Sequence, residues 1–139
     1  MIIRKFQTED TEQVVKLWDE CGLLHPPNDP YLEIKNKAVF QPDLFLVGES
    51  DGRVMASVMA GFEGRRGWIN YLAVLPEYQG KGYGSILIKH SMNMLKELGA
   101  PKINLLIRPT NKKVQDFYKK LGFQFEDVIL MAHRFPKEK

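Results

Sequence analysis

Cysteine is nearly absent from this sequence of 139 residues, in which Cys21 is the single example. An internal disulfide is therefore excluded, and no group of Cys and His residues has the spacing of zinc ligands. We expect no bound metal ion. Cys21 falls in a predicted helix, where a packed thiol is a simpler interpretation than a nucleophile.

Long apolar runs are also missing. No stretch approaches the ~18 residues of a membrane span, and the first four residues lack the basic start and apolar middle of a signal peptide. We therefore expect a cytoplasmic protein with no membrane partner. The formal net charge is only +3, and no stripe of Lys and Arg with interleaved aromatics is present, so nucleic-acid binding is not expected.

The composition that remains is typical of a globular protein, with 44% hydrophobic and 27% charged residues. This length corresponds to one domain, residues 1–139, and the sequence contains no repeat, low-complexity segment or linker.

Strand-like and helix-like segments alternate along the chain. The expected elements are a strand at 2–6, helices at 8–20 and 30–38, strands at 44–49, 54–62 and 68–75, a helix from 82–85 to 99, a strand at 102–107, a helix from 110 or 111 to 122, and one or two strands up to about Arg134. This mixture of hairpins and strand–helix–strand crossovers predicts an α/β fold of the mixed α+β kind, a mixed sheet covered by helices.

Several short signals support these boundaries. Thr8 can cap the first helix, and Asp29 followed by Pro30 supplies a cap and a first-turn proline for the second. Asp51-Gly52 suits the tight turn of a hairpin, and Gly99 suits the left-handed end of a helix.

A glycine-rich loop, Gln79-Gly-Lys-Gly-Tyr-Gly84, lies between a predicted strand and a predicted helix. Three glycines in five positions allow main-chain N–H groups to converge without interference from Cβ atoms, and the helix start adds unpaired donors and the positive end of its dipole. This arrangement suits a phosphate or pyrophosphate. The simpler alternative is a tight turn whose glycines only relieve crowding.

Spacing excludes two common phosphate-binding motifs. A P-loop requires Ser or Thr after Gly-Lys and a glycine five positions before it, and Gly80-Lys81 meets neither condition. A dinucleotide fingerprint requires a third glycine three residues after the second, where this chain has Ser85 or Leu87.

Two blocks of this sequence resemble motifs of the GNAT family of N-acetyltransferases. Leu72-Ala73-Val74 with Pro76, followed by Gln79-x-x-Gly82-x-Gly84, is similar to the acetyl-CoA motif. Asn111, followed by Phe117-Tyr118-x-x-Leu121-Gly122-Phe123, is similar to the later motif. Because Arg4, Asp10 and the element order also match, the resemblance covers nearly the whole chain and is closest to the small bacterial YpeA-like branch.

The resemblance implies the GNAT fold, a central mixed, mostly antiparallel sheet flanked by helices, and transfer of an acetyl group from acetyl-CoA to a primary amine by direct attack in a ternary complex. In the family, the strand matching residues 68–75 splays from its neighbour, so that its main chain can pair with pantetheine. The family often has Arg where Gln79 stands, so we expect backbone amides and Lys81 to bind more of the pyrophosphate here. The implied cofactor-binding residues are Leu72, Ala73, Val74, Gln79, Gly80, Lys81, Gly82, Tyr83, Gly84, Ser85, Asn111 and Phe117.

The resemblance also implies an acid for the departing thiolate. Tyr118 stands where the family places its tyrosine acid, and a phenol with pKa ~10 can donate a proton to a thiolate whose thiol has pKa ~8.5. The alternative is a tyrosine packed on the helix at 112–121. Asn111 can cap that helix, contact the cofactor, or do both.

A base for the amine is less well defined by the sequence. Glu63 is the best carboxylate, because it ends a strand beside the loop that leads into the cofactor strand, whereas Glu77 and Asp43 are less suitably placed. A solvated loop glutamate is the alternative interpretation, and water can replace a base.

The sequence does not distinguish between small amines, peptide N-termini and protein lysines as the acceptor. It is also compatible with a homodimer. Two other classes of function are compatible with the sequence: a regulatory or structural module that binds CoA without catalysis, and, less well supported by the weak charge, a nucleic-acid-binding module.

Overall fold

The computed structural model describes residues 1–136, which fall into two compact units, residues 1–106 and the part of the chain from residue 107 onward. The first unit contains β1 (Ile2–Lys5), α1 (Thr11–Glu20), α2 (Pro30–Ala38), β2 (Phe45–Ser50), β3 (Arg53–Phe62), β4 (Gly67–Val74), α3 (Tyr83–Glu97) and β5 (Ile103–Asn104). The second contains α4 (Lys112–Lys120). The expectation of a single domain stays a prediction.

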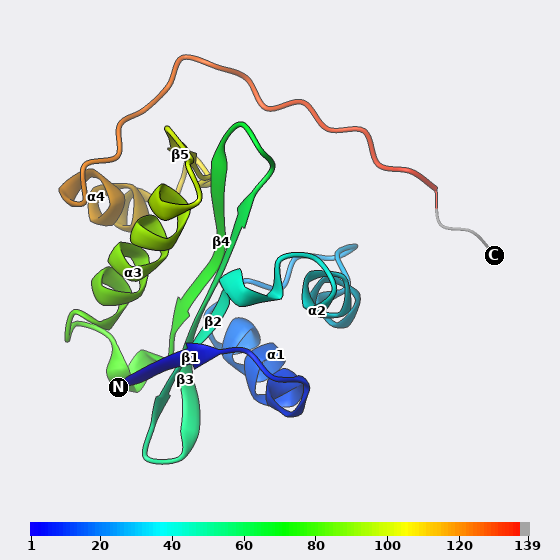
Figure 1. The fold of residues 1–139 in the computed structure, drawn as a ribbon, viewed down its shortest axis with the longest axis vertical. Coiled ribbons are helices and arrows are strands. Elements are labelled where there is room, and N and C mark those ends of the chain that lie inside the picture. The colour runs from blue at the N-terminus through cyan, green and yellow to red at the C-terminus, as the bar shows by residue number, and fades with distance from the viewer. Residues whose placement is uncertain (137–139) are drawn as a thin grey trace. The chain divides into compact units, whose positions relative to one another are not determined.

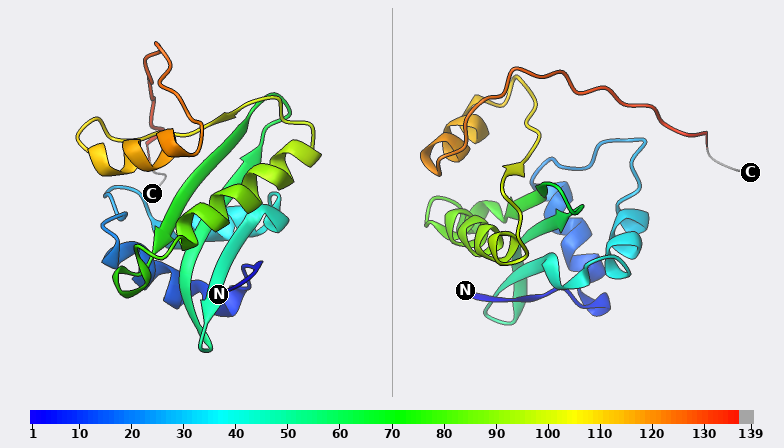
Figure 2. Two further views of the ribbon diagram at one scale, coloured as in Figure 1. Left: turned by 90° about the vertical axis from the view of Figure 1, so that its left-hand side faces the viewer. Right: turned by 45° about the horizontal axis from the view of Figure 1, so that its top comes forward.

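The first unit is built on a five-stranded sheet in the order β1-β2-β3-β4-β5. The first three pairs are antiparallel and β4 pairs with β5 in parallel, so the predicted mixed, mostly antiparallel sheet is confirmed. Helix α3 covers one face and helices α1 and α2 lie on the other (Figures 1 and 2). Because both faces are covered, residues 54–58 of the central strand β3 are buried without the alternation of a half-exposed strand.

Three local signals from the sequence are confirmed. Asp51 and Gly52 form the β2–β3 turn with φ of +53° and +76°, the left-handed pair that a two-residue hairpin requires. The Asp29 side chain caps α2 by accepting hydrogen bonds from the backbone N–H groups of residues 31 and 32. Gly99, with φ of +96°, follows the end of α3.

Two predicted boundaries are wrong. Residues 8–10 form a 3-10 turn and α1 begins at Thr11, because the side chain of Asp10, rather than that of Thr8, binds the incoming backbone by accepting from Gln7 N at 2.8 Å. The predicted strand at 102–107 is reduced to Ile103–Asn104.

The predicted strand or strands before Arg134 are also wrong, since described residues 122–136 contain neither helix nor strand. Several of their apolar side chains are exposed, including Phe125 and residues 128–131. These residue types favour a strand, but a strand also needs a partner for its backbone N–H and C=O groups, and the described part of the second unit provides none. Among residues 1–136, no helix has the length and apolar character that would carry it across a bilayer.

Arg4 links three elements of the first unit. Its guanidinium donates to both carboxylate oxygens of Asp10, at 2.8 and 2.9 Å, and to Glu49 of β2 at 3.2 Å. Asp10 is only 4% exposed and also accepts the Gln7 N–H, so these donors hold the pKa of its carboxyl below the ordinary value, with Arg4 the largest cause. The bidentate pair therefore fixes β1 against the start of α1.

We expect Asp10→Asn to lower the free energy of unfolding by ~1–3 kcal/mol at pH 7, because Arg4 loses a charged, bidentate partner. A carboxyl whose pKa is depressed by folding stabilises the protein above its unfolded pKa of about 3.9, and this contribution disappears as the pH falls through the folded value. The stabilities of wild type and variant should therefore converge below about pH 4. Urea unfolding at several pH values measures this. Exposed Asp19→Asn is the control and should change little; a loss for Asp10→Asn that is independent of pH would contradict the account.

Candidate functional site

The loop from Gln79 to Gly84 leads directly into α3. Gly80 and Gly82 have φ of +79° and +86°, a region that residues with a Cβ rarely adopt, and Gly82 is the N-cap. No side chain caps the helix, so its first N–H groups lack partners from the helix itself. A Cβ at either glycine would meet no atom within 4 Å, which means that the glycines serve the backbone conformation and leave open space beside it.

The polar side chains of this loop have separate environments. Gln79 Nε2 donates to the Val74 carbonyl at 2.8 Å, and this bond holds the loop against the end of β4. Lys81 is exposed, and its Nζ lies 5.8 Å from the ring centroid of Tyr78. A positive charge thus stands beside the open helix start.

Strand β4 is paired unequally on its two sides. Against β3 it is paired along most of its length, whereas its pairing with β5 covers only Gly67 and Trp68. Within the first unit, residues 69–74 therefore have a strand on one side only, which is the splay expected for this strand. The Val74 carbonyl is already engaged, because it accepts from Gln79 and from the thiol of Cys21 at 3.2 Å.

The β3–β4 ladder is interrupted by a bulge at Tyr71 and Leu72. Ser57 pairs with Ala73 and Met59 with Asn70, so two residues of β4 lie opposite one residue of β3. Tyr71 has φ of +53°, which is rare for an aromatic residue. Leu72 is also the first of the residues that the family resemblance assigns to pantetheine.

Buried groups hold the bulge in place. The Ser57 hydroxyl is fully buried; it donates to the Tyr71 carbonyl at 2.8 Å and accepts from Trp18 Nε1 at 2.9 Å. The rings of Trp18 and Tyr71 stack with centroids 3.8 Å apart. The Tyr71 hydroxyl donates to a carboxylate oxygen of Glu33 on α2, and burial, together with this bond, raises the pKa of the phenol.

Sequence reasoning missed Trp18, Ser57, Tyr71 and Glu33 as members of a common cluster. Glu33 is flanked in the sequence by apolar neighbours, which hints at a half-buried carboxylate, but nothing in the sequence links it to Tyr71 across 38 positions. The bulge at Tyr71 and Leu72 contains no glycine, so the sequence gives no signal that predicts it.

Glu63 lies elsewhere. It follows the end of β3 in the loop that joins β3 to β4, is exposed, and has Arg65 as an ion-pair partner at 3.5 Å. Gly67, the first residue of β4, is five positions from Leu72, or roughly 16 Å at the rise of a strand. The structure therefore does not bring Glu63 to the bulge, and its role as a base stays a prediction.

In the second unit, the Asn111 side chain caps α4 by accepting from Val114 N at 3.3 Å, which is one of the roles expected for it. Tyr118 is 7% exposed, and its ring makes edge contacts with Phe117 and Phe123 at 5.0 and 5.4 Å. Burial raises the pKa of the Tyr118 phenol, so it is protonated at neutral pH. Phe117 contacts Tyr118, and its role toward a cofactor stays a prediction.

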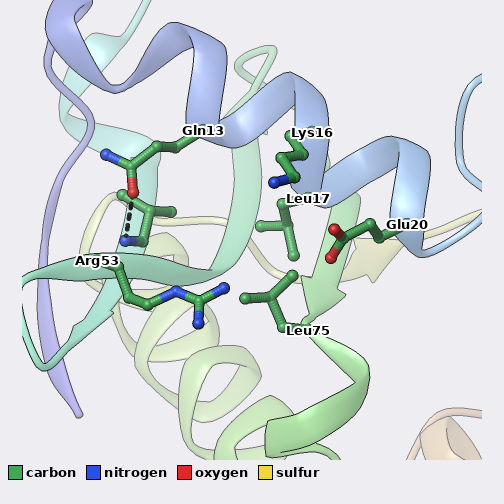
Figure 3. A pocket seen from close by; sticks show the side chains of 7 residues that line it. Gln13, Lys16, Leu17, Glu20, Arg53 and Leu75 are labelled. Atoms are coloured by element: carbon green, nitrogen blue, oxygen red, sulfur yellow. Dashed lines mark hydrogen bonds between the residues drawn. The ribbon is translucent and has the colours of Figure 1, made fainter.

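A small recess of about 160 Å³ lies between α1 and the start of β3 (Figure 3). Lys16, Glu20 and Arg53 stand around a floor formed by Leu17 and Leu75. It contains none of the residues that the sequence assigned to the site, and Arg53 is also paired with Glu77 at 3.2 Å.

The remaining expectations concern the thiol of Cys21 and metal binding. Cys21 is partly buried, donates to Val74 O and has its pKa raised, chiefly by burial, which agrees with a packed thiol rather than a nucleophile. Among residues 1–136, no group of three or more His, Cys, Asp or Glu side chains is arranged to hold a metal ion.

Known proteins resemble this chain along most of its length. The model of the "Acetyltransferase (GNAT) family" matches residues 11–123. An acetyltransferase of Yersinia pestis (strain Pestoides F) is 42% identical over 134 residues, which cover 96% of this chain and 95% of that protein. The crystal structure of Ard1 from Thermoplasma volcanium has a TM-score of 0.81 at 25% identity, with 90% of this chain and 83% of that chain covered. A predicted acetyltransferase from Clostridium acetobutylicum, solved with acetyl-CoA, shares the fold with a TM-score of 0.73 at 20% identity, covering 95% of each chain.

Proposed function

The chain belongs to the acetyltransferase (GNAT) family and is an acetyl-CoA-dependent acyltransferase, and we propose that it moves the acetyl group to a primary amine by direct attack in a ternary complex. The observation that carries this proposal is the junction of β4 with α3. There, a strand with one open side runs into a glycine loop and an uncapped helix start. Both features supply main-chain groups for one extended ligand that ends in a pyrophosphate.

The proposed cofactor path follows the chain. The main chain of residues 72–74 on the open side of β4 pairs with the pantetheine amides, apart from the Val74 carbonyl, which is already engaged. The main chain of Gly80 and residues 82–85 binds the pyrophosphate at the positive end of α3. Lys81 adds a charge. Gln79 supports this site indirectly, because its side chain holds the loop to Val74.

For the chemical step, Tyr118 is the proposed acid. Burial keeps this phenol protonated at neutral pH, which is the state that a donor to the CoA sulfur must have, and the same raised pKa makes it a weaker acid than a free phenol. Asn111 and Phe117 are proposed to contribute to the cofactor site through the family resemblance. The amine must lose its proton to Glu63 or to water before it attacks.

The direct test is a turnover screen. Purified protein receives acetyl-CoA and a panel of small amines, peptides with free N-termini, and lysine-containing peptides, and released CoA thiol is measured together with the acetylated product. Amine-dependent release supports the proposal. If acetyl-CoA binds but no amine is acetylated, the alternative of a non-catalytic CoA-binding module replaces it.

We expect Gly82→Val to weaken acetyl-CoA binding at least tenfold, because a branched side chain would occupy the space beside the amides that face the pyrophosphate. The matched control is Gly52→Val, which also replaces a left-handed glycine with open space around it, but in the β2–β3 turn. Each substitution should destabilise the fold by ~1–3 kcal/mol through backbone strain. Calorimetric titration with parallel melting curves separates the two effects; equal affinities for both variants would overturn the loop assignment.

We expect Tyr118→Phe to lower kcat at least tenfold while acetyl-CoA affinity changes little. The variant keeps the ring that contacts Phe117 and Phe123 and loses only the hydroxyl, and general acids typically contribute 10² to 10⁴ in rate. Single-turnover kinetics isolate the chemical step from product release. An unchanged chemical step would make Tyr118 a packing residue.

A further inference from the structure

The conformation of Tyr71 requires explanation. A non-glycine residue at positive φ costs ~1–3 kcal/mol and persists only where its surroundings impose it, and such residues cluster at functional sites. Here, the stack on Trp18 and the bond from Ser57 impose it. Bulges of this kind re-aim a side chain, and this one turns the Tyr71 phenol toward α2.

The group at the end of this arrangement is a carboxylate. Glu33 is half-buried and accepts the Tyr71 hydroxyl through Oε2. In the described part of the chain, no Lys, Arg or His side chain forms an ion pair with it. A partly buried carboxylate whose one side-chain partner among residues 1–136 is a neutral phenol favours a cation from outside.

The lysine one turn further along the same side of α2 has other neighbours. Lys37 lies one turn further along α2, but its Nζ lies beside Gly61 of β3, 3.6 Å from the point that a Cβ on this glycine would occupy. The same Nζ is 5.9 Å from the centroid of the Phe40 ring. Gly61 is three residues along β3 from Val58, which is opposite the bulge, or about 10 Å. Burial also lowers the pKa of Lys37, which weakens its charge.

We propose that Glu33 is the anionic anchor of the acceptor and holds it as a primary ammonium ion beside the ring of Tyr71, an assignment that rests on the proposed acetyl transfer. A carboxylate forms strong, charge-assisted hydrogen bonds with an ammonium group, and a tyrosine ring attracts a cation through its face. Tyr71 immediately precedes the residues proposed to bind pantetheine. An acceptor held here therefore lies next to the strand proposed to carry the acetyl donor. Its ammonium nitrogen must first release a proton to water, and the free amine then attacks the acetyl carbonyl as the CoA thiolate leaves. A positively charged acceptor is thus expected to bind more tightly than a neutral molecule of the same size.

Charge selectivity distinguishes an anchor from a bond that merely docks α2 on the sheet. The experiment titrates the CoA-loaded protein with n-butylammonium chloride and, separately, with n-butanol, and follows the indole N–H signal of Trp18 by NMR. Trp68→Phe identifies that signal, because the chain has two tryptophans. The same titrations are made with Glu33→Gln, with Glu33→Asp, and with Glu12→Gln, which removes a carboxylate that accepts a hydrogen bond from Tyr31 on the exposed surface.

We expect the wild type to bind n-butylammonium with saturation and at least tenfold more tightly than n-butanol. Glu33→Gln should remove this preference, Glu33→Asp should restore part of it, and Glu12→Gln should leave it unchanged. If the wild type shows no preference for n-butylammonium over n-butanol, the proposal is overturned whether or not Glu33→Gln folds. A folded Glu33→Gln protein that keeps the preference also overturns it. If the protein binds n-butylammonium selectively but acetylates no amine, the proposed function is refuted and the cation site at Glu33 stands. If it acetylates an amine but shows no charge selectivity, the site at Glu33 is refuted and the proposed function stands.

Discussion

The unequal pairing of β4 is the constraint on which the rest of the site depends. Its ladder with β3 places the strand inside the sheet, and its short pairing with β5 leaves residues 69–74 open on the other side. The strand then passes into the glycine loop and α3, so one continuous segment provides both an extended main-chain edge and a helix start. The same strand carries the bulge that turns Tyr71 toward Glu33. The proposed donor and acceptor sites thus share one strand.

This arrangement explains how a small chain can bring a donor and an acceptor together. Main-chain groups cannot be changed by side-chain substitution, which suits a cofactor whose recognition must not vary. The proposed acceptor side depends instead on side chains from α1 and α2, namely Trp18 and Glu33, which contact Tyr71 of β4. A scaffold of this kind can change its acceptor by substitution on the helices while the cofactor strand stays the same.

Much of the fold follows from local signals. The Asp51-Gly52 turn, the Asp29 cap and the Gly99 helix end are determined by residues within a few positions, and the sequence predicts them correctly. The prediction fails at the end of the chain, because a strand near Arg134 depends on a partner strand as well as on its own residue types. The glycine loop is predicted from its three glycines, its place between a predicted strand and a predicted helix, and the family resemblance. The cluster of Glu33, Tyr71 and Trp18 is not predicted, since it depends on a bulge and on contacts between elements far apart in the sequence.

The central claim is that acetyl-CoA lies along the open side of β4 and at the start of α3. Amide hydrogen exchange of the protein, followed by NMR with and without acetyl-CoA, tests it most directly. The account predicts slower exchange at residues 72–74 and 80–85 on binding, with no change at Gly52 in the β2–β3 turn, whose left-handed backbone is similar. Saturable binding of acetyl-CoA that leaves exchange at both segments unchanged would contradict it.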